Sequence, residues 1–206
     1  MKINLMTAII AGSILSGCVG GIAEIPATSR TATVTGGIVD ETLSNELNRS
    51  VSAVGVGTVA FVTGVDSDRG QMVASVGISG TPTVGAARTT GSGTYTTSYR
   101  YGVIDGITRS SSVISGYRGE ESGTMTVTAD FDSGQVSGSN SELTVSAHAS
   151  GNSLNGSVTA NYSYTGASGS VAGSLEGQIG ATGIIATFHG HDENTVMAGG
   201  LVGTSP

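Results

Sequence analysis

The second half of the chain alternates between apolar and polar residues over five separate runs. In residues 95–103, 125–131, 143–149, 158–164 and 171–179, the tyrosines and apolar side chains fall on one set of alternate positions, and mostly Ser and Thr fill the other. Successive side chains of a strand point to opposite faces, so a period of two predicts half-buried β-strands. Because each strand is apolar on one face only, the strands must cover a common core.

Short polar segments separate these runs. Residues 132–134, 150–152 and 166–169 are rich in Gly, Ser, Asp and Asn, which are typical of turns, and short turns make consecutive strands antiparallel neighbours. Glycine supplies 34 of the 206 residues, and glycine within strands suits the tight curvature of a small barrel. A closed barrel also removes exposed sheet edges. We therefore predict an all-β fold, a small antiparallel up-and-down β-barrel of about eight strands, over residues 92–206.

The first half is less regular. Residues 51–63 and 71–78 are expected to form two strands joined by a loop at 66–70, with 79–91 as a linker or long loop. This hairpin either adds strands to the barrel or stands outside it. Residues 40–49 predict a short helix, in which Asp40 caps the first turn and Leu43 and Leu47 share a face. Residues 18–50, with this helix, are expected to form a flexible tether.

The N-terminus has the pattern of a signal peptide. Lys2 precedes an apolar run, Ile3 to Leu15, and small residues follow, so residues 1–17 are predicted to be a lipoprotein signal peptide. The run is shorter than the ~20 residues that span a bilayer. Leu15-Ser16-Gly17-Cys18 resembles the lipobox of bacterial lipoproteins, which implies cleavage before Cys18 and acylation of its thiol. This lipid would make the membrane a partner. Cys18 is the only cysteine, so the lipidated protein would have no disulfide.

Charge and missing motifs exclude several functions. Fifteen acidic residues stand against eight basic ones, a net charge of −7, which argues against nucleic acid because its phosphates require clustered Lys and Arg. The sequence has no Gly-x-Ser-x-Gly motif, and its only lysine is Lys2, in the predicted signal peptide. We therefore expect no catalytic residues and no cofactor, and hence not an enzyme.

Two groups of side chains are candidate ligand sites. His189, His191 and Asp192 are candidate metal ligands, because two imidazoles and a carboxylate can hold Zn. The other interpretation of this segment is an ordinary polar turn, which we favour. Tyr95, Tyr99 and Tyr101 share one strand face and would either line a pocket or form core, with their hydroxyls reaching the barrel rim. We favour core.

The last hundred or so residues resemble the β-barrel of transferrin-binding-protein-B-like surface lipoproteins, and factor H binding protein of pathogenic Neisseria carries a related barrel. The matching segments are residues 123–131, 134–138, 154–158, 175–180 and, above all, 188–191 followed by 197–203. Family barrels commonly finish with Phe-x-Gly, a polar turn and Ala-Gly-Gly-Phe. This chain departs from the pattern in having Leu201 at the aromatic position, and it shows one barrel with no evident handle domain.

The resemblance and the lipobox together imply a lipid-anchored lipoprotein of the outer membrane or cell surface. Its barrel loops would bind a protein or an iron- or haem-related ligand. Val19 follows the anchor, whereas Asp at this position retains lipoproteins in the inner membrane of enteric bacteria, so Val19 favours the outer membrane. The alternatives are a structural envelope lipoprotein without a ligand and a minor metal-binding role through His189 and His191.

Overall fold

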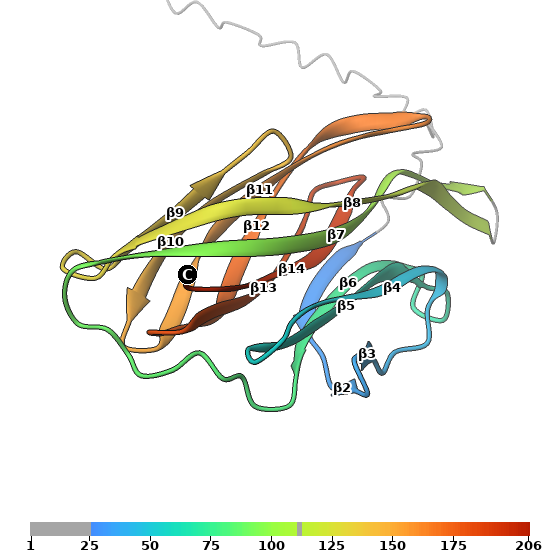
Figure 1. Cartoon of the computed structure of the whole chain (residues 1–206). Coiled ribbons are helices and arrows are strands. Elements are labelled where there is room, and N and C mark those ends of the chain that lie inside the picture. The colour runs from blue at the N-terminus through green and yellow to red at the C-terminus, as the bar shows by residue number, and fades with distance from the viewer. Residues whose placement is uncertain (1–25, 111–112) are drawn as a thin grey trace, which may run out of the picture.

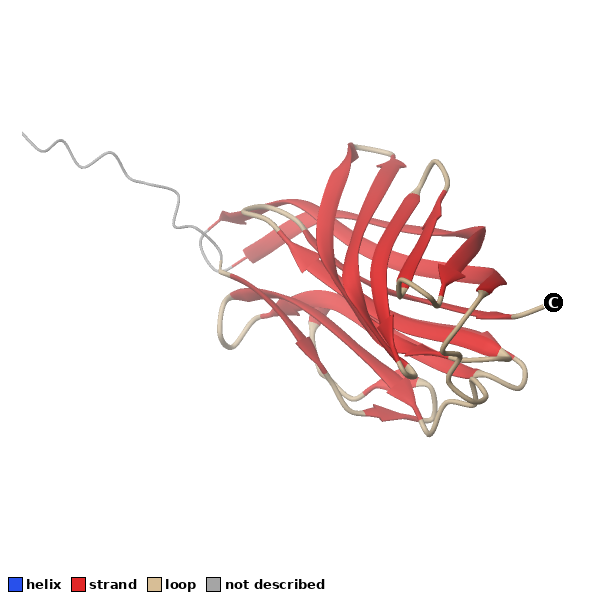
Figure 2. Cartoon of the chain, turned by 90° about the vertical axis from the view of Figure 1, so that its left-hand side faces the viewer, coloured by secondary structure: helices blue, strands red, loops and turns tan. Residues whose placement is uncertain are grey.

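The computed structural model describes residues 26–110 and 113–206, and all the regular elements in these ranges are β-strands (Figures 1 and 2). Cys18 and the predicted signal peptide lie outside the described residues. None of the described residues lies in a helix long and apolar enough to cross a bilayer.

Eight strands form a closed barrel, which confirms the predicted fold class. Each strand pairs antiparallel with the next along the chain, and β14 pairs with β7 to close the ring. The strands are β7 (Ser92–Ser110), β8 (Val113–Asp130), β9 (Gln135–Ser139), β10 (Leu143–Ser150), β11 (Ser153–Tyr164), β12 (Ala167–Ile179), β13 (Gly183–His191) and β14 (Val196–Thr204).

Side chains from all eight strands fill the barrel interior. They include Tyr95, Tyr101, Val127, Val136, Leu143, Val158, Leu175, Phe188 and Leu201, each at most 1% exposed. The tyrosine stripe is core, and each of its hydroxyls has a hydrogen-bond acceptor, as buried hydroxyls require; that of Tyr99 is the Glu142 carboxylate, at 3.2 Å. Tyr95 donates to the carbonyl of Gly180 at 2.7 Å, and Tyr101 donates to the carbonyl of Asn161. The interior is therefore a packed core.

A second sheet lies outside the barrel, in the order β1-β6-β5-β4. It consists of β1 (Ala27–Thr31), β4 (Ser44–Ala53), β5 (Gly57–Asp66) and β6 (Gln71–Ser79), and β1 runs parallel to β6. The hairpin around 51–78 thus adds no strand to the barrel, which answers the question that the sequence left open. A small hairpin, β2 (Val34–Thr35) and β3 (Ile38–Val39), packs on the far face of β5 through Val39.

The second sheet packs flat against one side of the barrel wall (Figure 1). Phe61 and Met72 meet Ile104 and Val196 of the wall, and all four are buried. Strands β13 and β14 are consequently buried on both faces, which explains why their apolar residues run almost without interruption. A Cβ on Gly200 would lie 2.3 Å from Val59 Cγ1, so the missing side chain lets the two layers approach.

The predicted helix at 40–49 is wrong, because residues 44–53 form β4. A bulge between Ser44 and Leu47 reverses the side-chain alternation. Leu43 therefore packs with the cluster around Val39 and Ala60, while Leu47 faces the barrel wall at Gly102. The four-residue spacing of the two leucines suggested one face of a helix, but the two side chains lie on opposite faces of the second sheet. The tether prediction is also wrong for residues 27–39, which include β1, β2 and β3.

Residues 80–91 cover one end of the barrel, here called the closed end (Figure 1, green linker before β7). The carbonyls of Val84 and Ala86 accept hydrogen bonds from the N–H groups of Thr182 and Ala181, at 2.9 and 2.8 Å. The guanidinium of Arg88 lies 5.1 Å from the ring centre of Phe131. The opposite end, here called the open end, carries the part of the β7–β8 ladder near Ser110 and Val113 and the turns at 140–142, 165–166 and 192–195.

Candidate functional site

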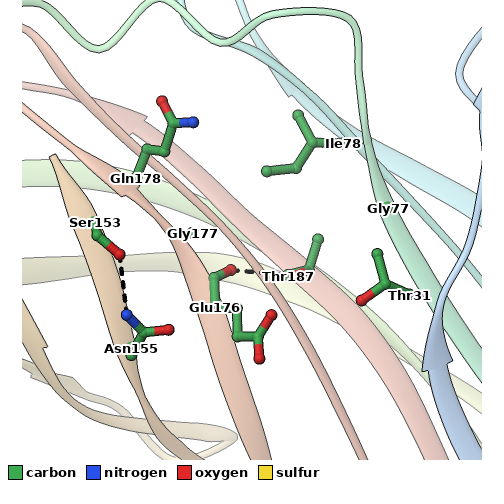
Figure 3. Close-up of a pocket in the computed structure, with 9 residues that line it drawn as sticks. All are labelled: Thr31, Gly77, Ile78, Ser153, Asn155, Glu176, Gly177, Gln178 and Thr187. Carbon is green, nitrogen blue, oxygen red and sulfur yellow. Dashed lines mark hydrogen bonds between the residues drawn. The ribbon is translucent and has the colours of Figure 1, made fainter.

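A groove follows one of the two junctions between the second sheet and the barrel wall (Figure 3). It has a volume of about 330 Å³, and a neighbouring hollow of about 330 Å³ continues it toward the open end. Both together are called the junction groove. Its lining is Thr31, Gly77, Ile78, Ser153, Asn155, Glu176, Gly177, Gln178 and Thr187, then Ser29, Ala172, Gly173, Ser174, His189, Gly190 and His191.

The alternation of the barrel strands makes the floor of the groove polar. On β12, Val171, Leu175 and Ile179 point inward, so Ser174, Glu176 and Gln178 point outward. Cross-strand pairing sets Glu176 beside Thr187, and Ser174 beside His189, on β13. The Thr187 hydroxyl donates to the carbonyl of Glu176 at 3.2 Å, which leaves the Glu176 carboxylate facing the groove (Figure 3).

The junction on the other side of the sheet is closed by charges. Arg49 of β4 donates to Glu120 of β8 at 2.7 Å, and Arg100 of β7 donates to the other oxygen of Glu120 at 2.6 Å. Leu47 fills the space below, 3.4 Å from where a Cβ on Gly102 would lie. The sheet is therefore fastened to the barrel wall along β4, while along β1 the junction stays open.

His189 and His191 do lie on one face of β13, as extended geometry requires, and both border the groove. Nδ1 of His189 is buried without a hydrogen-bond partner, and this burial lowers the pKa of His189. Asp192 instead belongs to the turn, where its carboxylate accepts from the N–H of Asn194 at 2.9 Å. Within residues 26–110 and 113–206, no three His, Cys, Asp or Glu residues gather closely enough to hold a metal ion.

The open end presents loops with carboxylates and an exposed aromatic ring. The β7–β8 ladder continues to Ser110 and Val113, whereas β14 stops pairing with β7 at Ile104, so this hairpin projects beyond the wall (Figure 1). Tyr117 on the projection is 54% exposed. The carboxylates at this end belong to Asp105, Glu121, Glu142, Asp192 and Glu193. The hydrogen bond from the Ser141 hydroxyl, helped by one from Tyr99, outweighs burial and lowers the pKa of Glu142.

The sequence did not predict the junction groove. Ser29 and Thr31 lie in a segment with few apolar residues, which gave no sign of a strand. Glu176 and Gln178 look like any other polar residues on an outer strand face, because the groove arises only when β1 and β6 stand beside them. Their alternation with apolar residues predicted correctly that they point outward, but it could not indicate that β1 and β6 lie on the other side of the groove.

The architecture is that of a filled eight-stranded barrel with a four-stranded sheet fastened to its wall. No family model matches the sequence, and no curated protein matches it. Solved structures do match it, among them the following three. Isotype 1 transferrin binding protein B from serogroup B Neisseria meningitidis is 11% identical with a TM-score of 0.48, and the match covers 77% of this chain and 35% of that one.

The second is intact Ap-TbpB, with its N and C lobes, at 15% identity and a TM-score of 0.44, covering 82% of this chain and 39% of that one. The third is HpuA from Kingella denitrificans in complex with human haemoglobin, at 14% identity and a TM-score of 0.38, covering 76% of this chain and 59% of that one. This chain thus spans between about a third and three fifths of their lengths. At these identities and TM-scores, none of them assigns a ligand to this chain.

Proposed function

We propose that this protein is a lipid-anchored lipoprotein of the outer membrane, displayed at the cell surface, that binds a protein or an iron- or haem-carrying ligand without catalysing a reaction. The observation that carries the proposal is the packed barrel. Tyr101 and Phe188 meet edge to face at its centre, with ring centres 6.2 Å apart, and both are fully buried. A ligand therefore has to be recognised on the outer surface.

The closed end offers little for recognition, because residues 80–91 occupy its backbone groups. At the open end, the turns at 140–142, 165–166 and 192–195 have no comparable linker over them in the described part of the chain, and loops on a rigid scaffold commonly carry binding residues. Tyr117 is suited to such a role, since exposed tyrosines often become the strongest contacts of an interface. The barrel holds these loops in place while they engage a partner in stoichiometric docking.

The anchor in this proposal is Cys18, acylated after removal of residues 1–17. Ala27 begins β1, so the connection from Cys18 is about nine residues and reaches at most ~30 Å at ~3.3–3.6 Å per residue. The folded module would accordingly stand close to the membrane. Three acyl chains would hold it stably, because two already do.

The test uses intact cells that express the full chain. Surface-accessible protein is detected with an antibody, and binding of fluorescent human haemoglobin, human transferrin and free haem is measured by flow cytometry. We expect saturable binding of one probe, at least fivefold weaker in Tyr117→Ser, with Ser122→Ala on the exposed face of β8 as the matched control. Metabolic labelling with a palmitate analogue should mark the wild type and not Cys18→Ala.

Two results would contradict the proposal. If intact cells display the protein but bind none of the probes, a structural envelope role replaces ligand capture. If the palmitate label persists in Cys18→Ala, the anchor is elsewhere.

A further inference from the structure

Among the described residues, β1 is an edge strand, and its outer edge borders the junction groove. The carbonyl of Pro26 accepts from the N–H of Met72, at 2.9 Å, and the N–H of Ala32 donates to the carbonyl of Val76, at 2.8 Å. Backbone groups of a strand point alternately to its two sides. The even-numbered residues therefore bond β6, and the N–H and C=O groups of Ala27, Ser29 and Thr31 point away from it.

The side chains of the same residues turn toward the barrel. Ala27, Ser29 and Thr31 pair with Met72, Ala74 and Val76, whose side chains pack against the wall. Ser29 and Thr31 accordingly line the groove, while Arg30 points to the far face and pairs with Glu41 at 2.8 Å. The groove thus combines an unpaired strand edge on one side with the outward faces of β12 and β13 as its floor (Figure 3).

We propose that an extended peptide segment of a partner protein adds to β1 as a further strand and lies in the junction groove. Strand addition obtains affinity from main-chain hydrogen bonds and specificity from every second side chain. The five residues of β1 match a partner segment of about five to seven residues. This inference rests on the proposed binding function and names a second surface for it, separate from the open-end loops.

The charge of the groove indicates the kind of peptide. Glu176 is the carboxylate in its lining, and neither Lys nor Arg lines it. A Lys or Arg on the inward-facing side of the added strand would lie over Glu176, and a carboxylate there would be repelled. The other edge of the second sheet, at β4, does not offer an equivalent groove, because the ion pair between Arg49 and Glu120 fastens it to the wall.

The test selects ligands from displayed random heptapeptides on the full-length lipoprotein in nanodiscs. We expect the enriched peptides to carry a Lys or Arg at a groove-facing position that can lie over Glu176. Ser29→Pro removes one outward N–H group and no bond to β6, because proline is tolerated on the free side of an edge strand. The best peptide should bind Ser29→Pro at least tenfold more weakly and Glu176→Gln about three- to tenfold more weakly.

Two matched controls separate strand addition from side-chain contact. Ser29→Ala keeps the N–H group and should change affinity less than threefold, and Glu46→Gln removes a charge from the opposite edge and should change nothing. A synthetic copy of the peptide, N-methylated at alternate residues, keeps its side chains but loses one hydrogen-bonding edge, and it should bind at least tenfold more weakly when the methylated edge is the one facing β1.

The inference is overturned if no peptide is enriched. It is also overturned if the affinity of the selected peptide is unchanged both by Ser29→Pro in the protein and by N-methylation of the peptide. Dimerisation of the chain that Ser29→Pro abolishes would also overturn it, since the occupant would then be a second copy. If cells bind a haemoglobin, transferrin or haem probe equally well through wild type and Ser29→Pro, the proposed function stands and the groove is not used for that ligand.

Discussion

The packing of Tyr164 on Gly119 gives a prediction that can be worked out in detail. Tyr164 ends β11 and lies across the open end, where its ring covers β8. A Cβ on Gly119 would lie 2.0 Å from Tyr164 Cδ1 and 2.1 Å from its Cε1. Carbon atoms at rest are ~3.5–4.0 Å apart, so Gly119→Ala must displace the ring by more than 1 Å. We expect a loss of about 1–3 kcal/mol of unfolding free energy, the usual cost of overpacking.

A double-mutant cycle isolates this contact. Tyr164→Ala alone should cost roughly 1–3 kcal/mol through lost burial, since the ring is half-buried and stacks on Tyr162 with centres 5.5 Å apart. Removing the ring removes the three atoms nearest to the new Cβ, so in the Tyr164→Ala background Gly119→Ala should cost only about a few tenths of a kcal/mol. The pair should therefore be less destabilised than the sum of the single variants by at least about 1 kcal/mol.

The assay is urea unfolding followed by circular dichroism, comparing midpoints at unchanged m-values. Ser122→Ala on the exposed outer face of β8 is the control, and its unfolding free energy should stay within about 0.5 kcal/mol of that of the wild type. If the costs of Gly119→Ala and Tyr164→Ala add within about 0.5 kcal/mol, the ring does not rest on this glycine, and the reasoning fails.

Three further predictions use the same urea assay. Phe61→Ala should cost about 3–5 kcal/mol, because this fully buried ring joins the second sheet to the wall, and a loss below 1 kcal/mol would mean that the two layers are not packed together. Burial works to raise the pKa of Glu41, but bonds from Arg30 and Ser75 outweigh it and lower the pKa. Glu41→Ala leaves the buried Ser75 hydroxyl without its acceptor and should cost about 1–3 kcal/mol, whereas Glu41→Gln, which still accepts, should cost less; equal costs would contradict the Ser75 contact. Burial lowers the pKa of His189, so the unfolded chain takes up this proton at a higher pH than the folded chain does, and the stability that depends on the neutral imidazole is present above pH 6.5 and lost as the pH falls below it. His189→Gln should therefore make the urea midpoint less dependent on pH between pH 7 and 5. If the midpoint of the variant changes with pH as much as that of the wild type, His189 is not buried in this way.

The barrel could be predicted from the sequence because its two faces differ in chemistry. Tyr95, Tyr99 and Tyr101 needed an apolar interior, and the Thr and Ser residues between them needed water, so a period of two remained visible along β7. The same logic placed the turn at 132–134. Here the Asp130 carboxylate accepts from the N–H of Asp132 at 3.0 Å and from the Ser133 hydroxyl at 2.8 Å.

The second sheet could not be placed in this way, because what surrounds its strands lies far away in the sequence. Phe61 and Val62 are both buried, one against the barrel wall and the other beneath Val39. A strand that is buried on both faces shows no alternation. β1 has the opposite problem, since its place depends on hydrogen bonds to β6 and its few apolar atoms leave no pattern. The groove depends on both strands and was hidden for that reason.

The closure of the barrel has a consequence for biogenesis. The pair β14–β7 joins Thr204 to Thr96 and Val196 to Ile104, so the last strand completes a ring that began about a hundred residues earlier. Contacts so distant in sequence form slowly, because a long loop must close before they stabilise anything. Until β14 has been synthesised, the edges of β7 and β13 that pair with it have no hydrogen-bond partner strand. A chain truncated before Val196 would therefore leave both edges unpaired.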